Sequence, residues 1–462
     1  MLINDIGKIK LAHFSIKEYL MSDDLLRGAA SFFHFTAEIS HSLIAQTCLA
    51  YLLQFDSHTF ISLEDQVIRS SPLAEYAAVY WTFHWRNGGI LEKSETSWMF
   101  RLTVRLFTPK SAQFVNWAKM YENWVKRDNR YSKRDDIATP LYYASEAGLV
   151  QVLKHLLKTE GDINIEGGEY GNGLQAASFS GYEMIVMLLL DKGANVNAQG
   201  GYYGNALQAA SFCGHEVIVK LLLEKRADVN AQGGYYGNAL QAASSHGHEV
   251  IVKLLLEVGA DVNVQEGQYG NALQAASSPG HEVIVKLLLE KGVDVNAQGG
   301  YYGNALQAAS FGGHEVMVKL LLEKGADVNA QGGDYGNALQ AASFGGHEVI
   351  VKLLLEKGAD VNAQGGYYGN ALQAASLCGH NVIVKLLLEN GADVNAQGGD
   401  YGNALQVASS CGHEMIVKLL LEKGADVNAQ GGDYGNALQA ASSGGHKVIM
   451  KLLLEKGADI NA

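Results

Sequence analysis

The sequence predicts an all-α fold, in which a solenoid of about ten 33-residue units follows a small helical domain. The string YGNALQAASFGGHEVIVKLLLEKGADVNAQGG returns with small changes through the last two-thirds of the 462-residue chain, and a fixed period of this length is typical of stacked repeats. Each unit holds two short apolar segments separated by Gly-His, which predicts a helix pair. All five tryptophans lie before residue 125 and the repeats contain none, so the two regions differ in chemistry.

The region before residue 125 is predicted to be mostly helical. Residues 41–55 carry apolar side chains at helical spacing, and residues 72–86 begin with Pro72 after Ser71, a cap followed by proline. The apolar residues of the first segment are Leu43, Ile44, Cys48, Leu49, Leu52 and Leu53, and those that share one face of the second are Tyr76, Val79, Tyr80 and Phe83. We expect both segments to belong to a helical packing domain.

The charged stretch KRDNRYSKRDD, residues 126–136, separates the two regions. It is typical of a linker or of an exposed helix end. We therefore expect a helical domain over 1–125, a linker over 126–138 and the repeats over 139–462.

The first helix of each unit is predicted from its start. In the unit that begins at Asn304, the asparagine is a good N-cap because its side-chain oxygen can accept from early helix amides. A short helix is expected over Ala305–Phe311, where the small Ala308 and Ala309 let neighbouring units approach closely. The amide of Gln307 can both donate and accept, so we expect it to bridge adjacent backbones.

The second helix of the same unit is expected over Glu315–Lys324, with Gly325 as a left-handed C-terminal cap. Pairs four residues apart, Glu315–Lys319 and Lys319–Glu323, would support its solvent side by a few tenths of a kcal/mol each. The expected apolar stripe consists of Val316, Met317, Leu320, Leu321 and Val318.

Two units depart from the pattern. Arg226 occupies the position of the cap glycine, which costs roughly 1 kcal/mol if the left-handed conformation is kept. We therefore expect this unit to fray first. Pro279 falls in the turn between two helices, where proline is tolerable.

The 33-residue period, the helix pairs and the Thr139-Pro140-Leu141 start resemble the ankyrin repeat. The resemblance covers 139–462 and implies an ankyrin-repeat solenoid, a fold that usually binds proteins and is rarely an enzyme. Most units have Asn-Ala where the family has Thr-Pro, and glutamine where it commonly has histidine. The leucines that mark the register are Leu141, Leu174, Leu207, Leu240, Leu273, Leu306, Leu339, Leu372, Leu405 and Leu438.

Three motifs in the N-terminal region, LAHFSIKEYL (11–20), IAQTCLAYLL (44–53) and PLAEYAAVYW (72–81), resemble the region that follows the nucleoside-triphosphatase module in fungal NACHT–ankyrin proteins. These are NLR-like receptors of the STAND class. The resemblance implies a role in non-self recognition, such as heterokaryon incompatibility. The chain has no GxxxxGK[ST] phosphate loop, so the nucleotide switch would be absent, lost or encoded upstream.

Composition narrows the classes of partner. The net charge is −13, and the repeats show no Lys/Arg cluster of the kind that binds a nucleic acid backbone. The N-terminus lacks a signal-peptide pattern, and no apolar run approaches the roughly 18 residues of a membrane span. The spacing of the four cysteines fits neither a disulfide framework nor a zinc site. We expect a cytoplasmic protein with reduced thiols that binds neither nucleic acid nor membrane.

Several patterns imitate catalytic or ligand sites. Histidines recur once per unit at a predicted 8–10 Å, roughly the helix-packing distance, which is too far apart to share a metal ion. The GGYYG loops lack the basic partner of a phosphate cradle. His13, Ser15, Lys17 and Glu18 lie in one short stretch with no group to orient a base. We expect no enzymatic activity, no metal and no cofactor.

The units differ from one another mainly in the finger before the repeated tyrosine and at the end of the first helix. In ankyrin arrays these positions line a concave groove, and aromatic residues are favoured at interfaces. We expect a protein ligand in a groove about 90 Å long, from nine steps of about 10 Å. A receptor's sensor and a stand-alone scaffold or adaptor both remain open. The expected protein-binding residues are Tyr202, Tyr203, Phe212, Tyr235, Tyr236, Tyr269, Tyr301, Tyr302, Phe311, Asp334, Tyr335, Phe344, Tyr367, Tyr368, Asp400, Tyr401, Asp433 and Tyr434.

Overall fold

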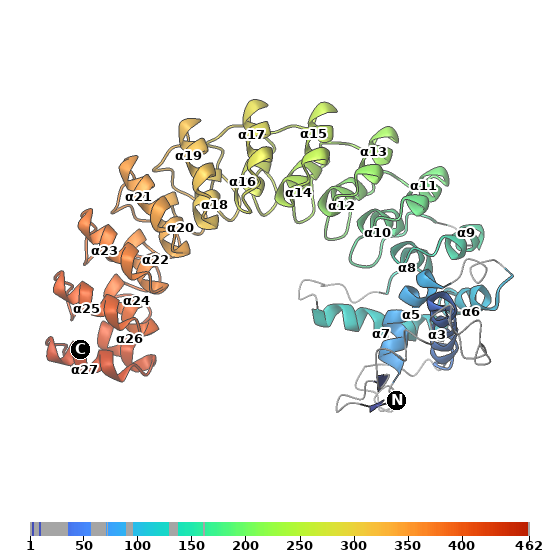
Figure 1. Cartoon of the computed structure of the whole chain (residues 1–462), viewed down its shortest axis with the longest axis horizontal. Helices are drawn as coiled ribbons and strands as arrows, with labels where there is room; N and C mark the ends of the chain where they lie inside the picture. The colour runs from blue at the N-terminus through green and yellow to red at the C-terminus, as the bar shows by residue number, and fades with distance from the viewer. Residues whose placement is uncertain are drawn as a thin grey trace, which may run out of the picture. The chain divides into compact units, whose positions relative to one another are not determined.

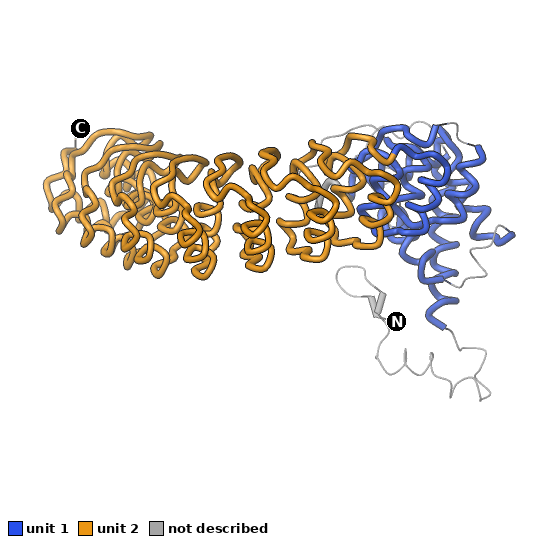
Figure 2. Tube along the Cα trace, turned by 90° about the horizontal axis from the view of Figure 1, so that it is seen from above, with its two compact units in different colours: residues 1–195 blue, residues 196–462 orange. Residues whose placement is uncertain are grey.

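The computed structural model of the chain forms two compact units, residues 1–195 and 196–462 (Figure 2). It describes residues 2–3, 9–10, 36–56, 71, 73–88, 96–128, 137–159 and 162–460. The motif at 11–20, most of the expected linker and Pro72 lie outside these residues. Apart from a two-residue antiparallel pair, β1 (Leu2–Ile3) with β2 (Ile9–Lys10), the described elements are helices, as the sequence predicts.

Among the described residues before 129, four helices build the first part of unit 1: α3 (Ala37–Leu52), α5 (Ala74–Asn87), α6 (Trp98–Leu106) and α7 (Ala112–Asp128). Side-chain caps begin two of them, because the Thr36 hydroxyl accepts from the amide of Ile39 and the Ser97 hydroxyl from that of Phe100. Trp81 and Trp117 meet edge to face with ring centroids 6.1 Å apart in the core. The Trp117 indole also donates to the Ala78 carbonyl at 3.0 Å, so the core is both packed and hydrogen-bonded.

The sequence pattern misplaced part of the buried face in α3 and α5. In α3, Leu43 and Ile44 are exposed. In α5, the apolar face expected from the spacing of the aromatic residues is also exposed, at Tyr76, Tyr80 and Phe83. The face that α5 buries is the opposite one, because small alanines there let the helix approach its neighbours and make room for two tryptophans. Its buried residues are Ala74, Ala77, Ala78, Trp81, His84 and Trp85.

The first two helix pairs of the repeat region complete unit 1: α8 (Pro140–Glu146), α9 (Val150–Thr159), α10 (Gly173–Ser180) and α11 (Glu183–Asp191). Helix α7 packs directly on α8. The Trp117 and Tyr143 rings lie 5.2 Å apart, and the Tyr143 hydroxyl donates to Glu122 at 2.7 Å. Tyr121 donates to Glu146 at 3.1 Å. The compact unit therefore ends at residue 195, whereas the sequence places the change of chemistry at 126–138.

Unit 2 is a curved stack of eight helix pairs, whose first helices form the inner row and second helices the outer row (Figure 1). The inner helices are α12 (Ala206–Cys213), α14 (Ala239–Ser245), α16 (Ala272–Ser277), α18 (Ala305–Gly312), α20 (Ala338–Gly345), α22 (Ala371–Leu377), α24 (Ala404–Cys411) and α26 (Ala437–Ser443). The outer helices are α13 (Glu216–Glu224), α15 (Glu249–Glu257), α17 (Glu282–Glu290), α19 (Glu315–Glu323), α21 (Glu348–Glu356), α23 (Asn381–Glu389), α25 (Glu414–Glu422) and α27 (Lys447–Glu455).

The core of unit 2 lies between the two rows. In α19 the buried side chains are Met317, Val318 and Leu321. Val316, which the apolar pattern assigns to the core, is 60% exposed, and this expectation is wrong. The first turn of the outer helix points it away from the inner row, and the equivalent residues of the other outer helices are also exposed. The expected Glu315–Lys319 ion pair is present.

Glutamine side chains tie each inner helix to the following repeat. Gln241 is fully buried. Its Oε1 accepts from the amide of Asn238 at 3.0 Å, and its Nε2 donates to the carbonyls of Glu266 at 3.1 Å and Gly270 at 2.9 Å. Asn238 in turn caps the helix by accepting from the Gln241 amide at 2.8 Å. Both the asparagine cap and the bridging glutamine are thus confirmed, and the same arrangement recurs around Gln208 and Gln406.

Histidine and asparagine form two further ladders. His347 Nε2 donates to the Phe311 carbonyl, 2.8 Å away in the preceding repeat. Asn329 accepts from the amide of Asp360 at 2.8 Å and donates to the carbonyl of Gly358 at 3.1 Å, both in the following repeat. The histidine ladder satisfies a carbonyl in the last turn of each inner helix, and the asparagine ladder satisfies backbone groups of the loop that follows each outer helix. The histidines therefore have a structural role, because each joins its own repeat to the preceding one by a hydrogen bond.

Arg226 keeps the left-handed conformation of the glycine that it replaces, with φ at 65°. At the equivalent Gly259 an added Cβ meets no atom within 4 Å, so the penalty comes from the backbone alone. We expect Arg226→Gly to stabilise unit 2 by about 1 kcal/mol, measured by thermal unfolding. Gly259→Arg should destabilise it by a similar amount. Hydrogen exchange in which the repeat around Arg226 is the best protected of all would contradict this account.

Candidate functional site

The finger loops from Tyr202 to Tyr367 join into a backbone ladder, and a separate bond of the same kind links Asp433 to Asp400. The amide of Tyr235 donates to the carbonyl of Tyr202 at 2.9 Å, and the amide of Tyr367 donates to that of Asp334 at 2.8 Å. The second glycine of each loop permits this approach. A Cβ on Gly333, whose φ is 63°, would lie 2.4 Å from the Tyr302 carbonyl carbon, closer than any side chain allows. The GGYYG sequence therefore serves close packing of fingers rather than a phosphate.

The repeated tyrosines stack on their counterparts in the next repeat from Tyr203 to Tyr368, and again from Tyr401 to Tyr434. Ring centroids of Tyr203 and Tyr236 lie 6.1 Å apart with a 2° interplanar angle, and those of Tyr302 and Tyr335 lie 6.1 Å apart at 10°. The series also includes the pairs Tyr236–Tyr269, Tyr269–Tyr302, Tyr335–Tyr368 and Tyr401–Tyr434. Tyr203, Tyr236 and Tyr335 are buried and the other rings of the series are half-buried, so much of this aromatic area is internal.

This stacking shortens the inner side of the array. The sequence predicts about 10 Å per step and a groove about 90 Å long, whereas the tyrosine centroids advance by 5.9–6.5 Å per repeat. The prediction of groove length is wrong at the fingers, because backbone hydrogen bonds hold them closer than helices can pack. The difference between finger spacing and helix spacing bends unit 2 toward its fingers, as its curved stack shows (Figure 1).

Phenylalanines at the ends of three inner helices fill the space beside the stacked tyrosines. Phe311 and Phe344 lie 4.7 and 5.5 Å from the Tyr335 ring, measured between centroids. Phe212 lies 4.9 Å from the Tyr236 ring. All three are half-buried. Their rings contact the tyrosine series, which they support.

The residue before each stacked tyrosine is the part of the finger that varies and reaches solvent. Tyr202 and Tyr235 stack on each other at 4.9 Å and are half-buried. Tyr301 and Tyr367 are 39% and 51% exposed. The acidic members, which are all exposed, are Asp334, Asp400 and Asp433. We call the row from residue 301 to residue 433, made of Tyr301, Asp334, Tyr367, Asp400 and Asp433, the tip row.

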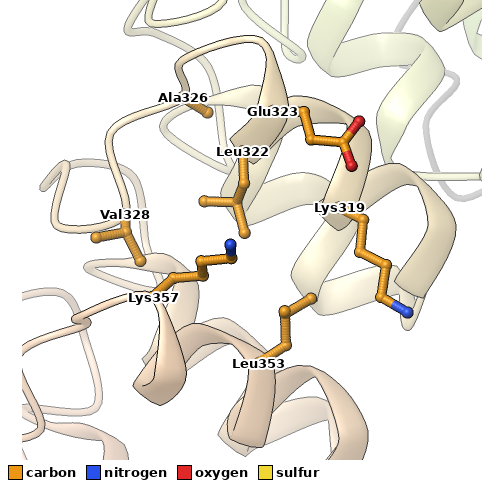
Figure 3. Close-up of a pocket in the computed structure, with 7 residues that line it drawn as sticks. All are labelled: Lys319, Leu322, Glu323, Ala326, Val328, Leu353 and Lys357. Carbon is orange, nitrogen blue, oxygen red and sulfur yellow. The ribbon is translucent and has the colours of Figure 1, made fainter.

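The outer face of the array has hollows of a different kind. One hollow of ≈ 410 Å³ lies between α19 and α21, where the Lys357 side chain reaches toward Leu322 and the Lys319 side chain extends away (Figure 3). A similar hollow lies between α23 and α25. Because it recurs between outer helices, this hollow is a property of the curved repeat rather than one specialised site.

The helical part of unit 1 contains a polar cluster that the sequence pattern did not indicate. His41 Nδ1 and His84 Nδ1 share a hydrogen bond at 2.7 Å, and Tyr76 bonds to His84 Nε2 at 2.8 Å. Burial and the neighbouring His41 lower the pKa of His84. Burial also raises the pKa of Cys48 to about 11, which makes its thiol a poor nucleophile at neutral pH.

In the described part of the chain, no three His, Cys, Asp or Glu side chains come together in a way that could hold a metal ion. Within the same residues, no helix combines the length and apolar character of a membrane span. His13, Ser15, Lys17 and Glu18 lie outside the described residues. The inter-repeat roles of histidine and asparagine were missed by the sequence analysis, although their recurrence in almost every unit is a signal that could have revealed them.

Comparison with known proteins agrees with this geometry. The family model described as ankyrin repeats (3 copies) matches residues 141–233, 174–266, 209–299, 240–332, 272–365, 306–398 and 374–462. A curated relative from Monascus ruber, azaphilone pigments biosynthesis cluster protein L, is 38% identical over 183 residues, which make up 37% of this chain and 37% of the relative. The chain thus spans little more than a third of that relative's length.

Among solved structures, the human ASB11 ankyrin repeat domain is similar to 48% of this chain over 98% of its own length, with 25% identity and a TM-score of 0.41. The family assignment rests instead on the family matches, which run from residue 141 to residue 462. They coincide with the helix pairs, the capped inner helices and the hydrogen-bonded fingers. This chain belongs to the ankyrin-repeat family.

Proposed function

We propose that the array is the ligand-sensing part of a fungal NLR-like NACHT–ankyrin receptor for non-self recognition, and that its ligand is a protein held along the inner side of unit 2. The ankyrin family implies a protein-binding array. The observation that carries the proposal is the tip row, where side chains vary and are exposed while the stacked tyrosines beneath them are fixed.

The N-terminal region supports the receptor part of the proposal. Its three motifs resemble the segment after the nucleoside-triphosphatase module of NACHT–ankyrin proteins. Helix α7 is joined to the first repeat by the Tyr143–Glu122 and Tyr121–Glu146 hydrogen bonds. We propose that residues 1–125 act as a helical domain that restrains an upstream nucleotide switch in the cytoplasm, and that ligand binding changes its contacts with the repeats.

The alternative is a stand-alone scaffold or adaptor without a nucleotide switch. The tip row supports the adaptor proposal as well as it supports the receptor proposal, because an exposed protein-binding surface would serve either function. The two differ in what precedes the array in the native polypeptide, and this is measurable.

An antibody raised against the repeats, used on extract of the source cells, separates the two proposals by size. The receptor proposal predicts a band well above 100 kDa, roughly the sum of an NTPase module and this 49.7 kDa chain, and nucleotide binding by the purified native protein. A band near 50 kDa without nucleotide binding would contradict the receptor and leave the adaptor.

A further inference from the structure

The charges of unit 2 are segregated between its two sides. Lysine and arginine occur only on the outer helices and in the two residues that follow each of them, from Lys220 to Lys456. The inner helices and fingers contain no basic residue. The tip row carries Asp334, Asp400 and Asp433, all exposed. A ligand on the inner side therefore meets carboxylates with no neighbouring cation on the same surface to neutralise them.

Aromatic rings flank the first of these carboxylates. The amide of Asp334 donates to the Tyr301 carbonyl at 3.0 Å and its carbonyl accepts from the Tyr367 amide at 2.8 Å. Asp334 therefore lies between two exposed tyrosines along the tip row. Tyr301 stands nearly perpendicular to Tyr335, at 89° and 5.6 Å between centroids, and their hydroxyls are 3.3 Å apart.

A similar pair of rings occurs two repeats later, without the backbone hydrogen bond that joins Asp334 to Tyr301. Tyr367 stands at 81° to Tyr401 with centroids 5.9 Å apart, beside the exposed Asp400. The hydrogen bond from Tyr367 and partial burial raise the pKa of Tyr401 to about 12, so the Tyr401 hydroxyl stays neutral at physiological pH. By contrast, where two tip tyrosines follow each other, Tyr202 and Tyr235 stack face to face. All four tip tyrosines stand at 70–83° to the stacked tyrosine of their own finger. Where the next finger carries an aspartate, the tip tyrosine has a carboxylate instead of a second tip ring as its neighbour in that finger.

We propose that the tip row binds an extended protein segment through arginine side chains. A guanidinium can bond a carboxylate with two N–H groups while its flat face lies against an aromatic ring. The two Tyr–Asp pairs offer both partners together. This inference rests on the proposal that the inner side of unit 2 binds a protein, and it names the class of segment.

The spacing of the carboxylates selects an extended ligand. The ring step is 5.9 Å from Tyr335 to Tyr368 and 6.4 Å from Tyr401 to Tyr434. One such step places Asp433 about 6 Å from Asp400, and two such steps would place Asp334 about 12 Å from Asp400. In a β-strand, side chains two residues apart lie on one face about 6.7 Å from each other, and four residues apart about 13 Å. Arginines at positions i, i+4 and i+6 of an extended segment match the three aspartates.

Fluorescence anisotropy of a labelled Gly/Ser peptide with arginine at positions 1, 5 and 7, titrated with the full chain, tests the proposal. We expect binding that Asp334→Asn and Tyr367→Leu each weaken at least five-fold. Glu323→Gln, on the outer helix α19, makes the same charge change and should leave binding within two-fold. A lysine peptide, and a peptide with arginines at positions 1, 2 and 3, should bind at least three-fold more weakly.

Equal binding by all three peptides, or equal losses from Asp334→Asn and Glu323→Gln, would show only attraction to the acidic chain and would overturn the proposal. Absence of binding would also overturn it. Neither result removes the proposed protein-binding function, which is tested separately by cross-linking from the same surface. Circular dichroism of each variant checks that the substitutions, all at exposed positions, leave the fold intact.

Discussion

Replacing Gln241 by alanine should lower the stability of the central repeats by about 3 kcal/mol. The substitution removes the partner of the Asn238 amide and of two carbonyl groups, Glu266 and Gly270, in the next finger. Each buried polar group left without a partner costs roughly 1–3 kcal/mol. Because repeats are stabilised by their neighbours, the loss should spread to both sides of the substituted repeat.

Hydrogen exchange resolved along the chain measures this effect. Amides in the finger from residue 264 to residue 270 should lose the most protection. The control is Gln232→Ala, which removes the same side chain from an exposed position and should change stability by less than about 0.5 kcal/mol. Equal effects of the two substitutions would mean that the glutamine bridge contributes nothing beyond its volume.

Glu146→Gln should stabilise unit 1 at pH 8 by roughly 2–4 kcal/mol and should flatten its pH dependence. Burial and the nearby Glu122 raise the pKa of Glu146 from an ordinary 4.5 to about 8. The hydrogen bond from Tyr121 acts in the opposite direction and lowers this pKa, whereas repulsion by Glu169 raises it slightly further. Between these two values the folded state holds a proton that the unfolded state has lost. The contribution of Glu146 to stability is therefore most favourable below about pH 4.5 and is lost as the pH rises to 8.

Tryptophan fluorescence measures this directly, because all five tryptophans lie before residue 125 and report only on unit 1. Urea midpoints of the full chain should fall between pH 5 and pH 8 in the wild type and remain nearly level in Glu146→Gln, whose amide can still accept from Tyr121. Glu183→Gln, at an exposed position of α11, should keep the wild-type slope. A wild-type midpoint that rises over this range would contradict the assignment.

The sequence predicts most of the repeat geometry because the period places equivalent residues in equivalent environments. The Asn304 cap, the bridge by Gln307 and the left-handed Gly325 are all confirmed. These features depend on contacts within one unit or with the adjoining backbone. For the same reason the left-handed φ of Arg226 follows from its position alone.

Features that depend on the tertiary environment were harder to predict. Val316 looks like a core residue by its type, but its exposure depends on the direction of the first turn relative to the inner row. In α5 the large Tyr76 and Tyr80 indicate the wrong face, because alanines pack more closely than tyrosines. The short spacing between successive fingers depends on hydrogen bonds between their loops, such as that from Tyr235 to Tyr202. A typical helix-packing distance does not predict this spacing.

The candidate surface was predicted as a set of finger and inner-helix residues, and the structure separates that set into layers. Tyr203, Tyr236 and Tyr335 are buried, whereas Tyr301, Tyr367 and the three aspartates reach solvent. Sequence variation between units identifies the exposed finger residues well, because only these residues can change without disturbing the stacked tyrosines. Burial of the repeated tyrosine could not be read from its type.

The central claim, that proteins bind along the inner side of unit 2, is tested most directly by site-specific photo-cross-linking in the source cells. A benzophenone side chain placed at Tyr367 should give a discrete adduct with another protein, and Asp334→Asn in the same chain should weaken that adduct. The same group at Val349, 56% exposed on the outer helix α21, should give none. Adducts from Val349 that equal or exceed those from Tyr367, or no adduct from Tyr367, would contradict the claim.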